Sequence, residues 1–204
     1  DGNDPLAGVS DDGAIASDCV ALLDGELPAG NHSIGYSKGI NGVMVDIAGL
    51  TDGDGLDISD FTFMVGALSE PSGWSEAPAP VSISVRQGDG VDGSDRVTII
   101  WEDGAIVGTW LQVTVHAGEH TGLTADDVFY FASQPGDLTG DGSADVSDLS
   151  ILASHYRDAA SNVNDGDVNG DGAVDVSDLS IFAGYYRDVL GQPPPLGRSA
   201  VAAC

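Results

Sequence analysis

The sequence predicts a mainly β protein, with an antiparallel β-sandwich followed by a small α-helical module. Two observations lead to this fold class. Between residues 34 and 132, short runs of alternating apolar and polar residues are bounded by Gly, Pro and Asp, as in antiparallel strands with one buried face. Beyond residue 136, an Asp- and Gly-rich loop followed by a helical pattern occurs twice.

The chain divides into four segments. Residues 1–33 are rich in Asp, Gly and Ala and form an N-terminal strand or linker. Residues 34–132 form the predicted sandwich, because about seven strands at this spacing are typical of that architecture. Residues 136–190 hold the helical module, and residues 191–204 form a flexible tail that begins near a run of prolines. The expected strands are centred on residues 43–47, 61–63, 81–85, 97–99, 111–115 and 128–130.

The charge of the chain excludes two classes of partner. Its 204 residues include 6 Lys and Arg against 33 Asp and Glu, which gives a formal net charge of −27. A chain with so few cations cannot release counterions from phosphates, so we expect no nucleic-acid partner. No apolar run approaches the roughly 20 residues of a membrane-spanning helix, so we also expect no membrane span.

An internal duplication is the most specific signal in the sequence. Residues 136–158 and 166–188 are identical at 16 of 23 aligned positions, and each carries the pattern D-x-[T/N]-x-D-G-x-x-D-x-x-D. In a calcium loop, oxygen atoms at positions 1, 3, 5, 7, 9 and 12 converge on one hard cation, and a glycine at position 6 permits a sharp turn. The duplication therefore predicts two bound Ca²⁺ ions, whose positive charge offsets part of the net negative charge.

The predicted calcium ligands occupy the same positions in both copies. In the first loop they are Asp137, Thr139, Asp141, the carbonyl of Ser143, Asp145 and Asp148, with Gly142 at the turn. In the second loop they are Asp167, Asn169, Asp171, the carbonyl of Ala173, Asp175 and Asp178, with Gly172 at the turn. After each loop, apolar residues at helical spacing predict one buried stripe per helix, and packing of the stripes couples folding to metal binding. The stripes are Leu149, Leu152, Ala153 and Tyr156, then Leu179, Phe182, Ala183 and Tyr186.

The duplicated loop–helix units, with Asp at position 12 and no helix before the loop, resemble the type I dockerin module. The resemblance covers about residues 136–188, roughly a quarter of the chain, and departs from the pattern at Thr139 and at the small Ala144. Dockerins bind cohesin domains, and they attach enzymes and other secreted bacterial proteins. The resemblance implies a cohesin-like receptor and a partner-binding surface around Val146, Ser147, Val176 and Ser177. The strand-rich part is similar to β-domains that precede such repeats in large secreted bacterial surface proteins.

Three catalytic motifs occur in the wrong structural context, so we expect no enzymatic activity. The H-x-x-E-H metalloprotease motif at 116–120 ends a predicted strand, whereas that chemistry needs a helix. The G-x-S-x-G motif at 35–39 precedes a strand, whereas a nucleophile elbow precedes a helix. The G-x-G-x-x-G motif at 88–93 is predicted to be a hairpin turn, because its aspartates would repel a pyrophosphate.

Three features leave alternatives open. Cys19 and Cys204 can form a disulfide between the chain ends, remain free thiols, or link one subunit to the next. Residues 51–60 form either a third calcium loop or a solvated turn. The sandwich would be a carbohydrate-binding domain if its tryptophans form an exposed row, namely Trp74, Trp101 and Trp110. If these side chains are buried, they contribute to packing instead.

Calcium sites without a buffering role suit an environment in which calcium is near millimolar, which predicts a secreted or cell-surface protein. The function expected is non-catalytic protein–protein attachment or extracellular assembly through the double calcium loop. The first alternative is a structural subunit that polymerises with copies of itself into an extracellular fibre. The second is the carbohydrate-binding sandwich.

Overall fold

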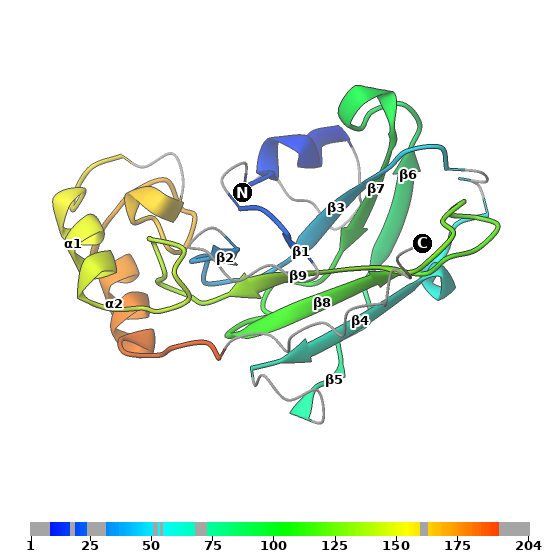
Figure 1. The fold of residues 1–204 in the computed structure, drawn as a ribbon. Helices are drawn as coiled ribbons and strands as arrows, with labels where there is room; N and C mark the ends of the chain where they lie inside the picture. The colour runs from blue at the N-terminus through cyan, green and yellow to red at the C-terminus, as the bar shows by residue number, and fades with distance from the viewer. Residues whose placement is uncertain are drawn as a thin grey trace, which may run out of the picture.

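The structure is a computed structural model that describes residues 9–16, 19–23, 32–50, 53, 55–67, 73–159 and 163–191. The described residues form two sheets, and two α-helices lie beyond one end of them (Figure 1). The prediction of a mainly β protein with antiparallel sheets is therefore confirmed. Along the described parts of the chain, neither helix is long and apolar enough to cross a bilayer.

The strands expected from the alternating pattern all form. One sheet has the strand order β1 (Leu22–Leu23), β9 (Asp127–Ser133), β8 (Thr109–Val115), β4 (Phe61–Gly66) and β5 (Ser75–Glu76). The other has the order β3 (Gly42–Ile47), β7 (Asp95–Ile100) and β6 (Ser82–Arg86). Neighbouring strands are antiparallel, except that the short β2 (Ser33–Ile34) runs parallel to β9. Residues 88–93 lie in the connection between the paired strands β6 and β7, as the hairpin prediction requires.

The main apolar core contains side chains from both sheets. Val97 and Ile99 of β7 and Leu111 and Val113 of β8 are completely buried in the same cluster. Their spacing of two along each strand is the alternation that the sequence shows, because successive side chains of a strand point to opposite faces. Trp101 joins this core and donates its Nε1–H to the carbonyl of Pro78 over 2.7 Å.

A second apolar cluster involves segments from both ends of the chain. Leu22, Trp110 and Tyr130 are buried in it, and Leu190, beyond the helices, packs against them. The indole N–H of Trp110 donates to the carbonyl of Gly191, so the chain returns to the sheet after the helical module. Because both Trp101 and Trp110 are buried, the tryptophans do not form an exposed row that could stack on a sugar.

The helices α1 (Val146–Ser154) and α2 (Val176–Tyr185) begin in the same way. Asp145 and Asp175 are the N-caps, and the aspartates three residues later complete a capping box in each helix. These aspartates, Asp148 and Asp178, are turned inward and buried.

The inward aspartates change which face of each helix is buried. Leu152 and Phe182, four residues after the inward aspartates, form the core contact. The predicted stripe is wrong for five of its eight members, which are exposed: Ala153, Tyr156, Leu179, Ala183 and Tyr186. The reason is that residues i and i+4 lie on the same face of a helix. When the third residue of the helix faces the loop, the residue four positions later also faces inward.

The two repeats hold one another through backbone hydrogen bonds. The N–H of Arg157, after α1, donates to the carbonyl of Val174 in the second loop over 2.7 Å. The N–H of Arg187, after α2, donates to the carbonyl of Ala144 in the first loop over 2.7 Å. The segment that follows each helix is therefore paired with the loop of the other repeat.

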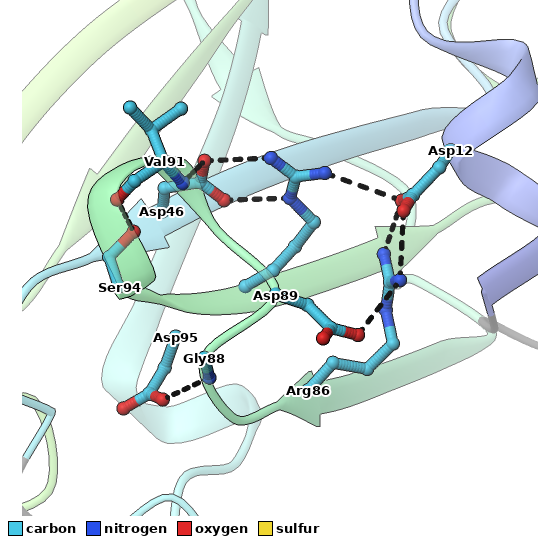
Figure 2. A network of polar contacts seen from close by, with 9 residues as sticks. Asp12, Asp46, Arg86, Gly88, Asp89, Val91, Ser94 and Asp95 are labelled. Atoms are coloured by element: carbon cyan, nitrogen blue, oxygen red, sulfur yellow. Dashed lines mark hydrogen bonds and ion pairs between the residues drawn. The ribbon is translucent and has the colours of Figure 1, made fainter.

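An ionic cluster lies on the second sheet and involves the N-terminal part of the chain (Figure 2). Arg96 of β7 donates two hydrogen bonds of 2.8 Å to the carboxylate of Asp46 on β3. Arg86 of β6 donates to both oxygens of Asp12, which lies in the 3₁₀ segment Val9–Ala14. The Arg96 guanidinium holds the pKa of Asp46 below its usual range, and Arg86 does the same for the pKa of Asp12.

We predict that Asp46→Asn lowers the free energy of unfolding by roughly 1–3 kcal/mol at neutral pH, as for other hydrogen bonds to charged groups. The native pKa of Asp46 is lowered, so its contribution is present above the unfolded value of about 3.9 and is lost as the pH falls through the native value. Urea unfolding between neutral and acidic pH measures the difference. Asp89→Asn, which removes a longer and more exposed contact to Arg86, should have an effect below about 0.5 kcal/mol. A difference for Asp46→Asn that persists unchanged at acidic pH would contradict this account.

Candidate metal centre

The first carboxylate of each duplicated loop organises that loop. Oδ1 of Asp137 accepts the N–H of Gly140 over 2.7 Å and that of Asp141 over 3.1 Å, and Oδ2 accepts the N–H of Gly142 over 2.8 Å. Asp167 accepts the three equivalent N–H groups of the second loop over 2.8, 3.0 and 2.8 Å. The chain thus turns tightly around a carboxylate. The glycine at position 6 has a φ of 84° in the first loop and 91° in the second, a conformation that favours glycine.

The last carboxylate of each loop closes it against the following helix. Oδ1 of Asp148 accepts the N–H groups of Leu138 and Thr139 over 2.8 and 2.9 Å, and Oδ2 accepts the N–H of Asp145 over 2.8 Å. In the second loop, Asp178 accepts the N–H groups of Asn169 and Asp175 over 3.2 and 2.9 Å. One side chain therefore caps the helix and joins the two ends of the loop.

These four carboxylates are buried without a basic partner. The residues Asp137, Asp148, Asp167 and Asp178 are at most 4% exposed. Within the described residues, no Lys, Arg or His forms an ion pair with any of them. Burial raises the pKa of Asp137, and the nearby charge of Asp148 acts in the same direction. Backbone N–H groups stabilise the carboxylates, but no positive charge in the described chain neutralises them.

The remaining predicted side-chain ligands lie towards the surface of the loops. Thr139 and Asp141 in the first loop, and Asp171 in the second, are exposed, whereas Asp145, Asn169 and Asp175 are partly buried. Several bond within their own loop: Asp141 accepts the N–H of Ser143, and Asn169 accepts the N–H of Asp171. Among the described residues, no three His, Cys, Asp or Glu side chains converge closely enough to hold a metal ion. The loops are thus closed by N–H groups around positions 1 and 12.

The predicted partner surface is exposed in both copies. Val146 and Val176 are each 61% exposed at the first position of their helices, and Ser147 and Ser177 beside them are also exposed. The N–H of each serine donates to the N-cap aspartate that precedes it. An aliphatic side chain and a hydroxyl therefore project from the same place in both repeats.

Two other expectations fall partly outside the described residues. Residues 51, 52 and 54 of the possible third loop are not described, and Asp57 and Asp60 form a capping box around the 3₁₀ turn Ile58–Asp60. Cys204 also lies outside the described residues, so the alternatives for the two cysteines stay predictions.

The two histidines of the H-x-x-E-H motif are held by different aspartates. Nδ1 of His116 lies 3.2 Å from Asp126, and its Nε2 lies 2.8 Å from the hydroxyl of Thr62. Nδ1 of His120 lies 3.1 Å from Asp60. The motif follows strand β8 instead of lying on a helix, so it lacks the arrangement of a zinc protease.

The structure brings one segment to the loops that sequence reasoning did not assign to them. Residues 35–37, here named the bridging segment, lie between β2 and β3 and contact both duplicated loops. They belong to the G-x-S-x-G motif, whose glycines are explained by close backbone approaches instead of by a nucleophile elbow. A Cβ on Gly39 would lie 2.0 Å from the carbonyl oxygen of Ile106.

No protein-family model, curated protein or solved structure matches the chain. The interpretation of the loops therefore depends on their own hydrogen bonds, burial and charge.

We predict that Asp148→Ala destabilises the helical module by roughly 2–4 kcal/mol, because three backbone N–H groups lose their acceptor and two of them join the ends of the loop. Urea unfolding in millimolar calcium, followed by circular dichroism at 222 nm, reports on α1 and α2. Ser150→Ala is the matched control, because it removes only an exposed hydroxyl that donates to Val146, and its effect should be below about 0.5 kcal/mol. Equal stability of the two variants would show that Asp148 does not hold the loop.

Proposed function

We propose that the chain is a non-catalytic calcium-binding protein that attaches to a protein partner outside the cell through a dockerin-like module at residues 136–190. The observation that carries this proposal is the pair of equivalent loops, each with two buried carboxylates and no basic partner among the described residues. Buried charges without a counter-charge are strongly unfavourable. A divalent cation in each loop supplies the missing positive charge.

The donor set favours calcium among the common cations. Every predicted ligand is a carboxylate, hydroxyl, amide or carbonyl oxygen, which is the preference of a hard cation with six to eight ligands. Position 1 is already oriented by the N–H groups of residues 140–142 and 170–172, so the loop is shaped before the ion arrives. Binding draws the side chains at positions 3 and 5, most of which are exposed, towards the ion and stabilises the module.

The attachment surface is proposed at the N-terminal turns of α1 and α2. Val146 and Val176, with the serines beside them, offer the same exposed chemistry twice. A cohesin-like receptor is the proposed partner, and copies of the chain itself are the alternative. The two sheets form the sandwich that carries this module, and the burial of Trp101 and Trp110 argues against a carbohydrate-binding role for it.

We predict that isothermal titration of the chelated protein with Ca²⁺ gives two bound ions, with dissociation constants below the roughly 1 mM calcium found outside cells. Asp141→Ala and Asp171→Ala each remove a position-5 ligand that is exposed in its loop, so each variant should bind one ion. Asp158→Asn is the control, because its carboxylate is exposed and belongs to neither ligand set. It should bind two ions.

Two results would contradict the calcium assignment. One is the absence of binding heat and of any calcium-dependent rise in the unfolding temperature of the unmodified chain. The other is a stoichiometry that Asp141→Ala and Asp171→Ala leave unchanged, which would locate the ions outside the duplicated loops.

A further inference from the structure

The bridging segment, residues 35–37, contacts both calcium loops within three consecutive residues. It follows β2, which pairs with β9, and leads towards β3 of the other sheet. Its position is therefore fixed by the β-domain. The two loops that it contacts belong to the repeats of the helical module.

Gly35 lies against the first loop at its first ligand. The N–H of Gly136 donates to the carbonyl of Gly35 over 2.9 Å. A Cβ at this position would lie 2.4 Å from the carbonyl oxygen of Asp137, so only glycine fits here without a shift of the backbone. The backbone of the segment is thus packed directly on the residue whose carboxylate organises the loop.

Tyr36 and Ser37 lie against the second loop. The N–H of Ser37 donates to the carbonyl of Val168 over 2.9 Å, and Val168 stands between the ligands at positions 1 and 3. The ring of Tyr36, which is buried, lies over Gly170, where a Cβ would come within 2.9 Å of it. The N–H of that glycine donates to Asp167, so the ring rests on backbone that the position-1 carboxylate holds.

The contacts of the segment involve residues whose positions depend on the closed loops. Val168 and Gly170 keep their places only while the second loop is wrapped around Asp167, and calcium favours that arrangement by neutralising the buried carboxylates. If a contact forms only when the loop is wrapped around its position-1 carboxylate, calcium stabilises that contact. By thermodynamic linkage, the contact must raise the affinity of the loop for calcium by the same factor.

We propose that residues 35–37 form a calcium-dependent latch, which holds the helical module on the β-domain when both loops carry calcium and releases it when they do not. This inference rests on the proposed calcium binding. The latch makes the orientation of the attachment surface relative to the sheets a function of calcium. It also gives the β-domain a part in setting the affinity of the second loop.

The amide of Ser37 reports directly on the latch in the unmodified chain. Hydrogen exchange followed by NMR should show this amide protected in millimolar calcium and exchanging at least about tenfold faster after chelation. The amides of Val97 and Leu111 in the core strands should not change.

The amides of Gly140 and Gly170 report on the loops themselves. If they respond to chelation and Ser37 does not, the latch is wrong. If none of them responds, calcium binding and the latch both fail.

A substitution tests the reciprocal effect on affinity. In an Asp141→Ala background, which leaves only the second loop to be titrated, Tyr36→Ala should weaken calcium binding by about fivefold or more. Tyr36→Phe keeps the ring over Gly170 and should restore most of the affinity. Tyr156→Ala removes an exposed ring of the module that lies beside Arg157, and it should leave the affinity unchanged. Equal affinities for Tyr36→Ala and Tyr36→Phe, with the core amides still protected, would overturn the proposal.

Discussion

Burial of aspartate carboxylates without a basic partner among the described residues is the constraint that shapes the helical module. Asp137 and Asp167 draw the N–H groups of their loops inward, which requires left-handed glycines at the turns. Asp148 and Asp178 complete the capping boxes of the helices and join them to the start of each loop. The direction of the helices, and the face that they bury, both follow from where these carboxylates must lie.

The helical module is integrated with the sheets and is not a separate appendage. The chain enters it directly from β9, where the bridging segment lies against it, and it leaves through Leu190 and Gly191, which return to Trp110 on β8. Both ends of the module are therefore held on the β-domain. A force applied to the helical module would therefore reach the sheets through several contacts and not through one linker.

The sequence was informative wherever a local rule decides the structure. Alternation predicted strands β3, β4 and β6 to β9, because each strand buries one face, and the duplication predicted two equivalent loop–helix units. The predicted helical stripe holds at Leu152 and Phe182 but fails elsewhere, because Asp148 is a polar residue that faces inward, which hydrophobic periodicity does not reveal. The bridging segment and the pairing of Arg86 with Asp12 join residues far apart in the chain, and no local pattern marks such contacts. Gly35 belongs to a motif that the following strand excludes as a nucleophile elbow, and nothing in that motif reveals the close approach to Asp137.

The reciprocal pairing of the repeats has a consequence for how such a module arises. Each loop is completed by the segment that follows the other helix, through Arg187 at Ala144 and Arg157 at Val174. A solitary repeat would leave that backbone edge open and would satisfy it only by borrowing the tail of a second copy. The module therefore resembles a domain-swapped dimer whose two subunits are joined in a single chain. Because the two copies are covalently linked, their association does not depend on protein concentration.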